Sequence, residues 1–141
     1  MKNKLYLSWK WVDEQINTIG ENLESLDKPL EFVAGVPRGG LIPAVMMSHA
    51  FDIKYISYSS AKMLPREVRE NTLVVDDISD TGHTLKEAEE LGFITSTLTM
   101  RNTTKLVPRY TGTIVNNDSW LVFPWEKLDS IPMQDYLVDQ E

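Results

Sequence analysis

The sequence predicts an α/β protein built on a mainly parallel sheet that is flanked by helices. Short apolar segments typical of buried strands alternate along the chain with segments whose apolar residues recur at helical spacing. Because parallel neighbours need a crossover connection, this alternation favours βαβ units. The two chemically suggestive segments, 37–40 and 76–84, both follow predicted strands, and ligands of such sheets bind beyond the carboxyl ends of the strands.

The individual elements follow from local patterns. Ser8 is placed to cap a first helix, whose apolar residues recur at helical spacing from Trp9 to Leu23, although Gly20 weakens the second half of that pattern. The polar stretch 59–71 has alternating charges and is predicted to be an exposed loop or a short hairpin. The remaining predicted elements are a strand at 31–36, a helix at 41–51, a strand at 53–58, a strand at 72–76, a helix at 84–91, and strands at 93–100 and 112–115.

Composition limits the classes of function. The chain of 141 residues fits one domain over residues 1–141, and its 42% hydrophobic content supports a real core. A net charge of −7 without a basic stripe argues against a nucleic-acid partner. The lack of cysteine excludes a disulfide framework and thiolate zinc sites. No stretch approaches the roughly 18 apolar residues of a membrane span, and no signal peptide is apparent, so we expect a cytoplasmic protein without a membrane partner.

The most informative segment is LVVDDISDTGHT, from Leu73 to Thr84. An apolar strand carries the adjacent carboxylates of Asp76 and Asp77, and a loop of small hydroxyl residues then leads through Gly82 into a helix. Backbone N–H groups at a helix start, together with such hydroxyls, bind phosphate, and a glycine lets the backbone approach it. The two carboxylates are placed to accept ribose hydroxyls or to help hold Mg²⁺. The alternative is a plain strand–turn–helix connection whose Asp and Thr residues only cap the helix.

This segment resembles the phosphoribosyl pyrophosphate motif of type I phosphoribosyltransferases: an apolar strand, two acids, two variable residues, then Asp-Thr-Gly-x-Thr. The resemblance implies the type I phosphoribosyltransferase fold with a small C-terminal hood region, and a requirement for Mg²⁺. It also implies that Asp76 and Asp77 meet the ribose hydroxyls and help hold the metal, and that Asp80 is a catalytic acid near N7 of a purine. The implied 5′-phosphate site is Ser79, Asp80, Thr81, Gly82, His83 and Thr84.

Residues 36–43, VPRGGLIP, resemble the pyrophosphate loop of the same family, and most closely that of small bacterial xanthine-guanine and hypoxanthine phosphoribosyltransferases. The resemblance implies that Arg38 has a catalytic role toward the leaving pyrophosphate. It further implies that the peptide bond between Pro37 and Arg38 is cis, as relatives often have it. The implied pyrophosphate-binding residues are Pro37, Arg38, Gly39 and Gly40. The alternative is an ordinary β–α turn that uses its glycines for tight geometry.

Residues 117–125, NDSWLVFPW, resemble the purine-binding end of these enzymes, where an aromatic ring stacks on the base and backbone groups read its edge. Arg101 falls where relatives carry a lysine that meets the purine 6-oxygen, and a guanidinium does not replace an ammonium there without consequence. The implied base-binding residues are Arg101, Trp120 and Leu121. Two alternatives stay open: Trp120 is ordinary core, or Arg101 points to solvent or pairs with an acid such as Asp118.

Together these resemblances imply transfer of the 5-phosphoribosyl group from phosphoribosyl pyrophosphate to a 6-oxopurine, giving a nucleoside monophosphate and pyrophosphate. A cation at Arg101 favours the carbonyl of hypoxanthine, guanine or xanthine over the amino group of adenine. The partners are then small molecules, and we expect a homodimer or homotetramer.

One rival function belongs to another class: a non-catalytic protein of the same fold that senses phosphoribosyl pyrophosphate or a nucleotide. The pair Ser57-Tyr58 resembles the start of the loop that closes over the site in relatives, and the stretch 59–71 is shorter than theirs, which weakly favours the rival. The presence of Arg38 and Asp80 argues against it, since a sensor has less need of a cation for the leaving group and an acid beside the base.

Overall fold

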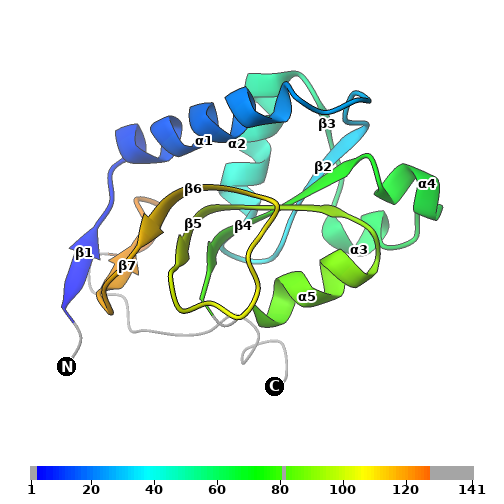
Figure 1. The fold of residues 1–141 in the computed structure, drawn as a ribbon. Helices are drawn as coiled ribbons and strands as arrows, with labels where there is room; N and C mark the ends of the chain where they lie inside the picture. Colours follow the sequence, from blue (N-terminus) through cyan, green and yellow to red (C-terminus); the bar gives the residue numbers. More distant parts are fainter. Residues whose placement is uncertain (1–2, 81, 128–141) are drawn as a thin grey trace.

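The computed structural model describes residues 3–80 and 82–127 (Figure 1). Within them, strands and helices largely alternate, as predicted. The elements are, in chain order, β1 (Lys4–Tyr6), α1 (Trp9–Leu23), β2 (Phe32–Gly35), α2 (Leu41–Phe51), β3 (Lys54–Tyr55), α3 (Tyr58–Ala61), α4 (Arg66–Arg69), β4 (Thr72–Ser79), α5 (His83–Glu90), β5 (Ile94–Arg101), β6 (Tyr110–Val115) and β7 (Trp120–Val122).

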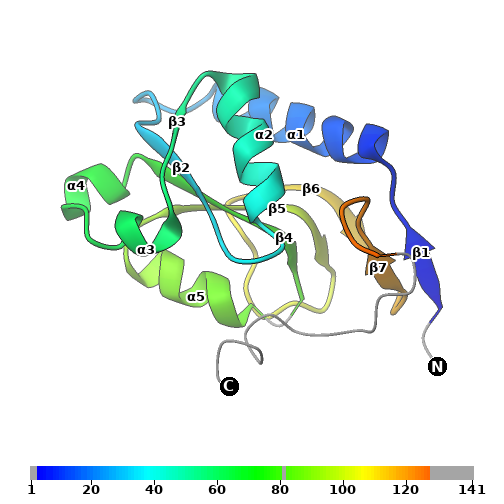
Figure 2. The same ribbon diagram turned by 180° about the vertical axis from the view of Figure 1, so that it is seen from behind.

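The central sheet is parallel throughout, with the strand order β3-β2-β4-β5-β6. Helices α1 and α2 lie on one side of it and α3 and α5 on the other, as Figures 1 and 2 show from opposite directions. A separate two-stranded sheet pairs β1 with β7, also in parallel, with Lys4 opposite Trp120. The α/β class predicted from the sequence is therefore confirmed.

Strand β4 is buried on both faces. Leu73 and Val75 pack into the hydrophobic cluster under α1 and α2, whereas Val74, which points to the opposite face, packs into the cluster under α3 and α5. All three side chains are fully buried. A strand covered on both faces reads as a continuous apolar run, which explains the sequence pattern of β4. The residues at its carboxyl end are consequently held by a rigid support.

The first helix forms as predicted. The backbone N–H of Trp11 donates to Oγ of Ser8, the N-cap residue, over 3.0 Å. The helix also continues through Gly20, where a Cβ would lie only 2.6 Å from Cε1 of Phe51. Gly20 thus allows α1 to approach α2 closely, and this contact outweighs the weak helix propensity of glycine.

The prediction of an exposed loop or hairpin at 59–71 is wrong. The segment contains the short helices α3 and α4, and β3 ends at Tyr55 instead of residue 58. Ser57 caps α3 by accepting from the N–H of Ser60, while Tyr58 and Ala61 are buried in the cluster under α5. Two buried residues three positions apart are typical of a helix face, and the polar residues between them masked that signal.

Tyr58 ties α3 to α5. Its hydroxyl donates to Oε1 of Glu87 over 2.8 Å, and Nζ of Lys62 lies 3.3 Å from the same oxygen. Burial, with a further contribution from Glu87, raises the pKa of the Tyr58 hydroxyl well above its ordinary value of about 10. The segment after β3 is therefore anchored to the helix that follows the predicted phosphate loop.

The burial of Tyr58 and its bond to Glu87 predict that the folded protein loses stability at alkaline pH. Above about pH 10 the unfolded chain ionises Tyr58 while the folded protein keeps it protonated, so its contribution to stability falls as pH rises. Tyr58→Phe should lower the free energy of unfolding by about 1 kcal/mol at neutral pH and lose less stability than wild type between about pH 10 and 11. Denaturant unfolding at several pH values measures both effects. Tyr6→Phe, at an exposed tyrosine, is the control. Identical alkaline losses in wild type and Tyr58→Phe would contradict this role.

Across residues 3–80 and 82–127, none of the helices combines the length and the apolar character needed to cross a membrane.

Candidate active site

The two adjacent acids lie inside β4, because the strand extends to Ser79 rather than ending at Asp76 as predicted. Oδ1 of Asp76 accepts from the backbone N–H of Asp77, and Oδ1 of Asp77 accepts from the N–H of Ile78, both over 2.8 Å. Both acids are partly buried. These local bonds orient two carboxylates near the carboxyl end of the central strand.

The predicted pyrophosphate loop connects β2 with α2 and is fastened to β4. The N–H of Val36 donates to the carbonyl of Val75, and the N–H of Gly40 donates to the carbonyl of Val36. The peptide bond between Pro37 and Arg38 is cis, which confirms that prediction. Arg38 itself is exposed and lies in the turn before α2.

The glycines of this loop bring it against the acids. A Cβ built on Gly39 would overlap the carboxylate of Asp77, and one built on Gly40 would overlap the carbonyl oxygen of Val75. The loop and the acidic end of β4 therefore form one continuous surface, which a larger residue at either position would separate.

These two glycines provide a matched pair of variants. Gly40→Ala meets the backbone of Val75 and Val36, so we expect a loss of roughly 1–3 kcal/mol in stability. Gly39→Ala meets a side-chain carboxylate, which can turn away, so its stability should stay within about 1 kcal/mol of wild type while turnover falls about 10²-fold. Thermal unfolding and steady-state kinetics separate the two effects. A Gly39→Ala enzyme with wild-type turnover would contradict a shared ligand surface at Asp77.

The predicted phosphate loop opens α5 through Gly82. This residue has φ of 78°, in the left-handed region, and a Cβ there would lie 2.7 Å from Cβ of Leu106. His83 is exposed and Thr84 is partly buried, whereas Thr81 lies outside the described residues. Both the backbone conformation and the contact with Leu106 therefore require glycine here, and the approach of this backbone to a phosphate stays a prediction.

The Ser79 hydroxyl makes contacts that the sequence did not predict. The residue is 2% exposed, and its Oγ donates to the carbonyl of Leu106 over 2.8 Å and lies 2.9 Å from Oγ1 of Thr104. The side chain thus holds the loop between β5 and β6 against the phosphate loop. No local pattern signals such a bond across 27 positions.

Asp80 and Arg101 meet at the ends of β4 and β5. Arg101 is 6% exposed, and its Nε lies 3.6 Å from Oδ1 of Asp80. Its Nη1 donates to the carbonyl of Asn117 over 2.8 Å and its Nη2 to that of Ser119 over 2.5 Å. Arg101 is therefore buried, and the acid beside it is Asp80 rather than Asp118.

The predicted base-binding residues Trp120 and Leu121 lie in β7. Leu121 is 4% exposed and belongs to the cluster under α1 and α2. Trp120 is partly buried, its backbone N–H donates to the carbonyl of Asn3, and its Nε1 is buried without a hydrogen-bond partner in the described part of the chain. The polar edge of the indole is thus turned into the protein.

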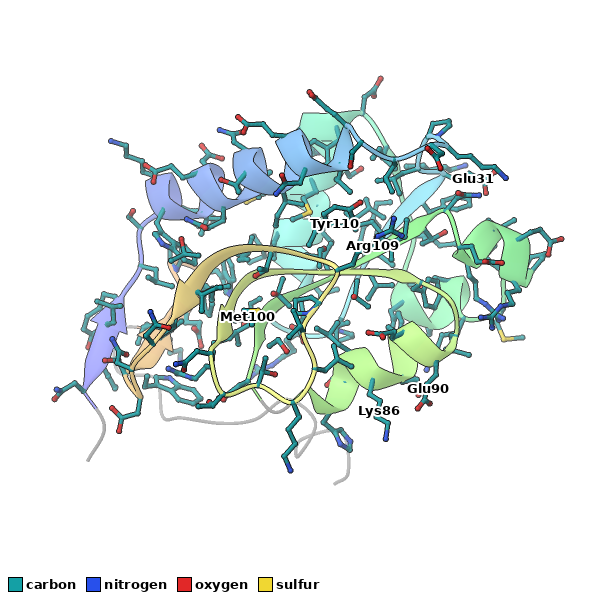
Figure 3. The ribbon with its side chains drawn as sticks, viewed as in Figure 1. Glu31, Lys86, Glu90, Met100, Arg109 and Tyr110 are labelled. Carbon is teal, nitrogen blue, oxygen red and sulfur yellow. The ribbon has the colours of Figure 1, made fainter. Side chains whose placement is uncertain are left out.

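A cavity of about 730 Å³ adjoins the phosphate-loop side of α5. Lys86 and Glu90 project from α5, away from the sheet (Figure 3). The cavity is lined by Gly82, His83, Lys86, Glu89, Glu90, Lys105 and Leu106. The cavity therefore touches the predicted phosphate site, but it does not extend to the acids of β4 or to Trp120.

Several curated proteins named xanthine-guanine phosphoribosyltransferase are similar to this chain, although no protein-family model matches it. The one from Nitratidesulfovibrio vulgaris is 30% identical over 115 residues, which are 70% of each chain. The one from Cereibacter sphaeroides is 29% identical over 114 residues, 67% of this chain and 68% of the relative. The one from Chromohalobacter salexigens is 24% identical over 150 residues, 95% and 90% of the two chains.

Solved structures agree with this relationship. The purine phosphoribosyltransferase of Pyrococcus horikoshii superposes with a TM-score of 0.73 at 33% identity, over 94% of this chain and 99% of that one. The xanthine-guanine-hypoxanthine phosphoribosyltransferase of Helicobacter pylori has the same fold, with a TM-score of 0.71 at 16% identity over 89% and 93% of the chains. With the acids of β4, the predicted pyrophosphate loop and the helix start at Gly82 gathered at one end of the sheet, the chain belongs to the type I phosphoribosyltransferase family and is an enzyme of that class.

Proposed function

We propose that this enzyme transfers the 5-phosphoribosyl group from phosphoribosyl pyrophosphate to a 6-oxopurine and releases a nucleoside monophosphate and pyrophosphate. The observation that carries the proposal is the contact surface of Asp77 with Gly39, which joins the acidic end of β4 to the pyrophosphate loop. The base class is supported by the relatives, which are named as xanthine-guanine and purine phosphoribosyltransferases.

In the proposed mechanism the substrate lies along the carboxyl ends of the strands. Asp76 and Asp77 accept hydrogen bonds from the ribose hydroxyls, while the N–H groups at the start of α5 bind the 5′-phosphate. Arg38 and the N–H groups of its loop stabilise the negative charge that develops on the departing pyrophosphate. As the bond from C1′ to the pyrophosphate breaks, C1′ gains positive character and the purine nitrogen attacks it. Fixed positions of both reactants supply much of the rate enhancement.

The base binds on the other side of C1′. Asp80 takes the proton that the purine loses as its ring nitrogen forms the new bond. Trp120 stacks on the base, and this suits an indole whose polar edge is buried, since its face then carries the interaction. Backbone groups at Leu121 read the edge of the base, because the Leu121 side chain is packed in the core.

The residues present fit a Mg²⁺ ion shared with the substrate. Within residues 3–80 and 82–127 no group of three or more Asp, Glu or His side chains is placed to hold a metal. The two carboxylates Asp76 and Asp77 suffice for Mg²⁺, which typically binds one or two carboxylates together with substrate phosphates. Asp77 would hold the ion, with Asp76 beside it, and the bound ion would neutralise charge on the pyrophosphate.

We also propose a homodimer or homotetramer, for which the exposed Ile42 and Val45 of α2 offer an apolar surface.

A panel of bases tests the proposal. Hypoxanthine, guanine, xanthine, adenine, uracil and orotate are each incubated with enzyme, phosphoribosyl pyrophosphate and Mg²⁺, and nucleoside monophosphate is quantified by chromatography. We expect kcat/KM for at least one 6-oxopurine to exceed that for adenine by about 10²-fold or more. A preference for adenine or a pyrimidine would contradict the assigned base class.

A further inference from the structure

The Arg101 guanidinium is engaged by the protein on three sides. Its two terminal nitrogens donate to the carbonyls of Asn117 and Ser119, and its Nε faces the carboxylate of Asp80. A buried guanidinium with partners on each side is held in one orientation. Both carbonyls belong to the loop that leads from β6 into β7. The Arg101 side chain therefore joins this loop to Asp80 at the end of β4, which is far away in the sequence.

The strand register places this arginine at the junction of both segments. Ser79 in β4 pairs with Met100 in β5, so Asp80, which follows β4, lies next to Arg101, the last residue of β5. On its other side Arg101 pairs with Val115, the last residue of β6, from which the loop 116–119 departs. The phosphate loop and the loop before Trp120 therefore meet at Arg101.

The loop 116–119 has few other fixed points. The N–H of Ser119 donates to Oδ1 of Asn117 over 2.9 Å, which closes a turn inside the loop, and the next residue, Trp120, begins the pairing with β1. Arg101 supplies two hydrogen bonds that tie the loop to the central sheet. A planar fork can hold two carbonyls at once, whereas a lysine offers a single point of charge.

We propose that Arg101 is a positioning residue that fixes the loop 116–119, and through it the ring of Trp120, relative to Asp80. It sets the distance between the base-stacking surface and the acid beside the base, rather than meeting the base carbonyl itself. The inference deepens the proposed function, because it takes Trp120 and Asp80 as the two sides of the base site.

Arg101→Met tests the proposal, since methionine retains the apolar stem without the donors. Hydrogen exchange of peptides that cover residues 116–122 should become at least about 10-fold faster. KM for the purine should rise about 10-fold, while KM for phosphoribosyl pyrophosphate changes less than about 2-fold. Arg109→Met is the matched control, because Arg109 is exposed and lies just before β6, at the opposite end of the strands from Met100 (Figure 3). It should leave exchange and both constants unchanged.

Two further variants keep the test decisive if Arg101→Met folds poorly. Arg101→Lys restores a charge that reaches one carbonyl, so its exchange rates and KM for the purine should fall between those of wild type and Arg101→Met. Asn117→Ala removes the turn bond from an exposed residue and leaves Arg101 intact. It should raise KM for the purine in the same direction, by about 2- to 5-fold.

The outcomes separate this inference from the proposed function. Unchanged exchange at 116–122, combined with a reduced preference for hypoxanthine over adenine in Arg101→Met, would show direct contact with the base and overturn the positioning role. Unchanged exchange and unchanged KM would overturn it as well. If wild type transferred to no purine, the proposed function would fail, while the exchange measurement would still decide whether Arg101 holds the loop.

Discussion

Replacement of Asp77 by asparagine is expected to lower turnover by roughly 10²-fold or more while the protein stays as stable as wild type. The loss follows because an amide has no charge to help hold Mg²⁺ and is a poorer acceptor for ribose hydroxyls. Stability is retained because Oδ1 of asparagine still accepts from the N–H of Ile78. Asp76→Asn should behave in the same way, since Oδ1 at that position accepts from the N–H of Asp77.

Steady-state kinetics and thermal unfolding of the two variants measure these effects. Asp13→Asn provides the matched control, because Asp13 is exposed on α1 at a distance from the strand ends. It removes the same charge and should retain wild-type turnover. Near-normal kinetics in both Asp76→Asn and Asp77→Asn would refute the assignment of the ribose site.

Asp80→Ala is expected to reduce turnover by roughly 10²- to 10⁴-fold, as is typical when an acid–base group is lost, with binding of phosphoribosyl pyrophosphate retained. The carboxylate also faces the buried guanidinium of Arg101, so the alanine variant should lose about 1–3 kcal/mol of stability. Asp80→Asn keeps a polar group beside Arg101 but lacks the basicity of a carboxylate. It should therefore show the same kinetic loss with a smaller loss of stability.

Calorimetric titration with phosphoribosyl pyrophosphate and Mg²⁺ distinguishes the roles of Asp80. An unchanged dissociation constant together with slow turnover supports an acid that acts on the base. An equal loss of binding and turnover would make Asp80 part of the phosphate scaffold instead. Wild-type turnover in Asp80→Asn would remove the acid–base role altogether.

Local sequence signals predicted the elements whose boundary residues and apolar pattern lie within or next to the element itself. Helix α2 spans Leu41–Phe51 as predicted, beginning after Gly40 and followed by its C-cap Asp52, whose φ of 53° is left-handed. Strands β1 and β7 were not predicted, because each has three residues and gains its partner from the other end of the chain. Pairing at that separation leaves no local trace.

The candidate site shows the same contrast between features with a local sequence signal and contacts between distant segments. The acids of β4 and the loop after β2 were predicted to lie together because the two strands end at the same edge, and they are neighbours in the sheet. The contacts of the Ser79 hydroxyl and the two carbonyls at Arg101 were not predicted, since they depend on how the loops 102–109 and 116–119 fold back. The sequence therefore placed the predicted ligand-binding segments at one edge of the sheet, but it did not reveal the contacts that support them.

The most direct test of the proposed reaction is phosphorus NMR of the enzyme mixed with phosphoribosyl pyrophosphate, Mg²⁺ and a mixture of hypoxanthine, guanine and xanthine. The proposal predicts that the substrate signals are replaced by nucleoside monophosphate and pyrophosphate in equal amounts, only when a base is present, and much more slowly with Asp77→Asn. Persistence of phosphoribosyl pyrophosphate with every base, or its hydrolysis to ribose 5-phosphate at a rate independent of the base, would contradict a transferase that acts on 6-oxopurines.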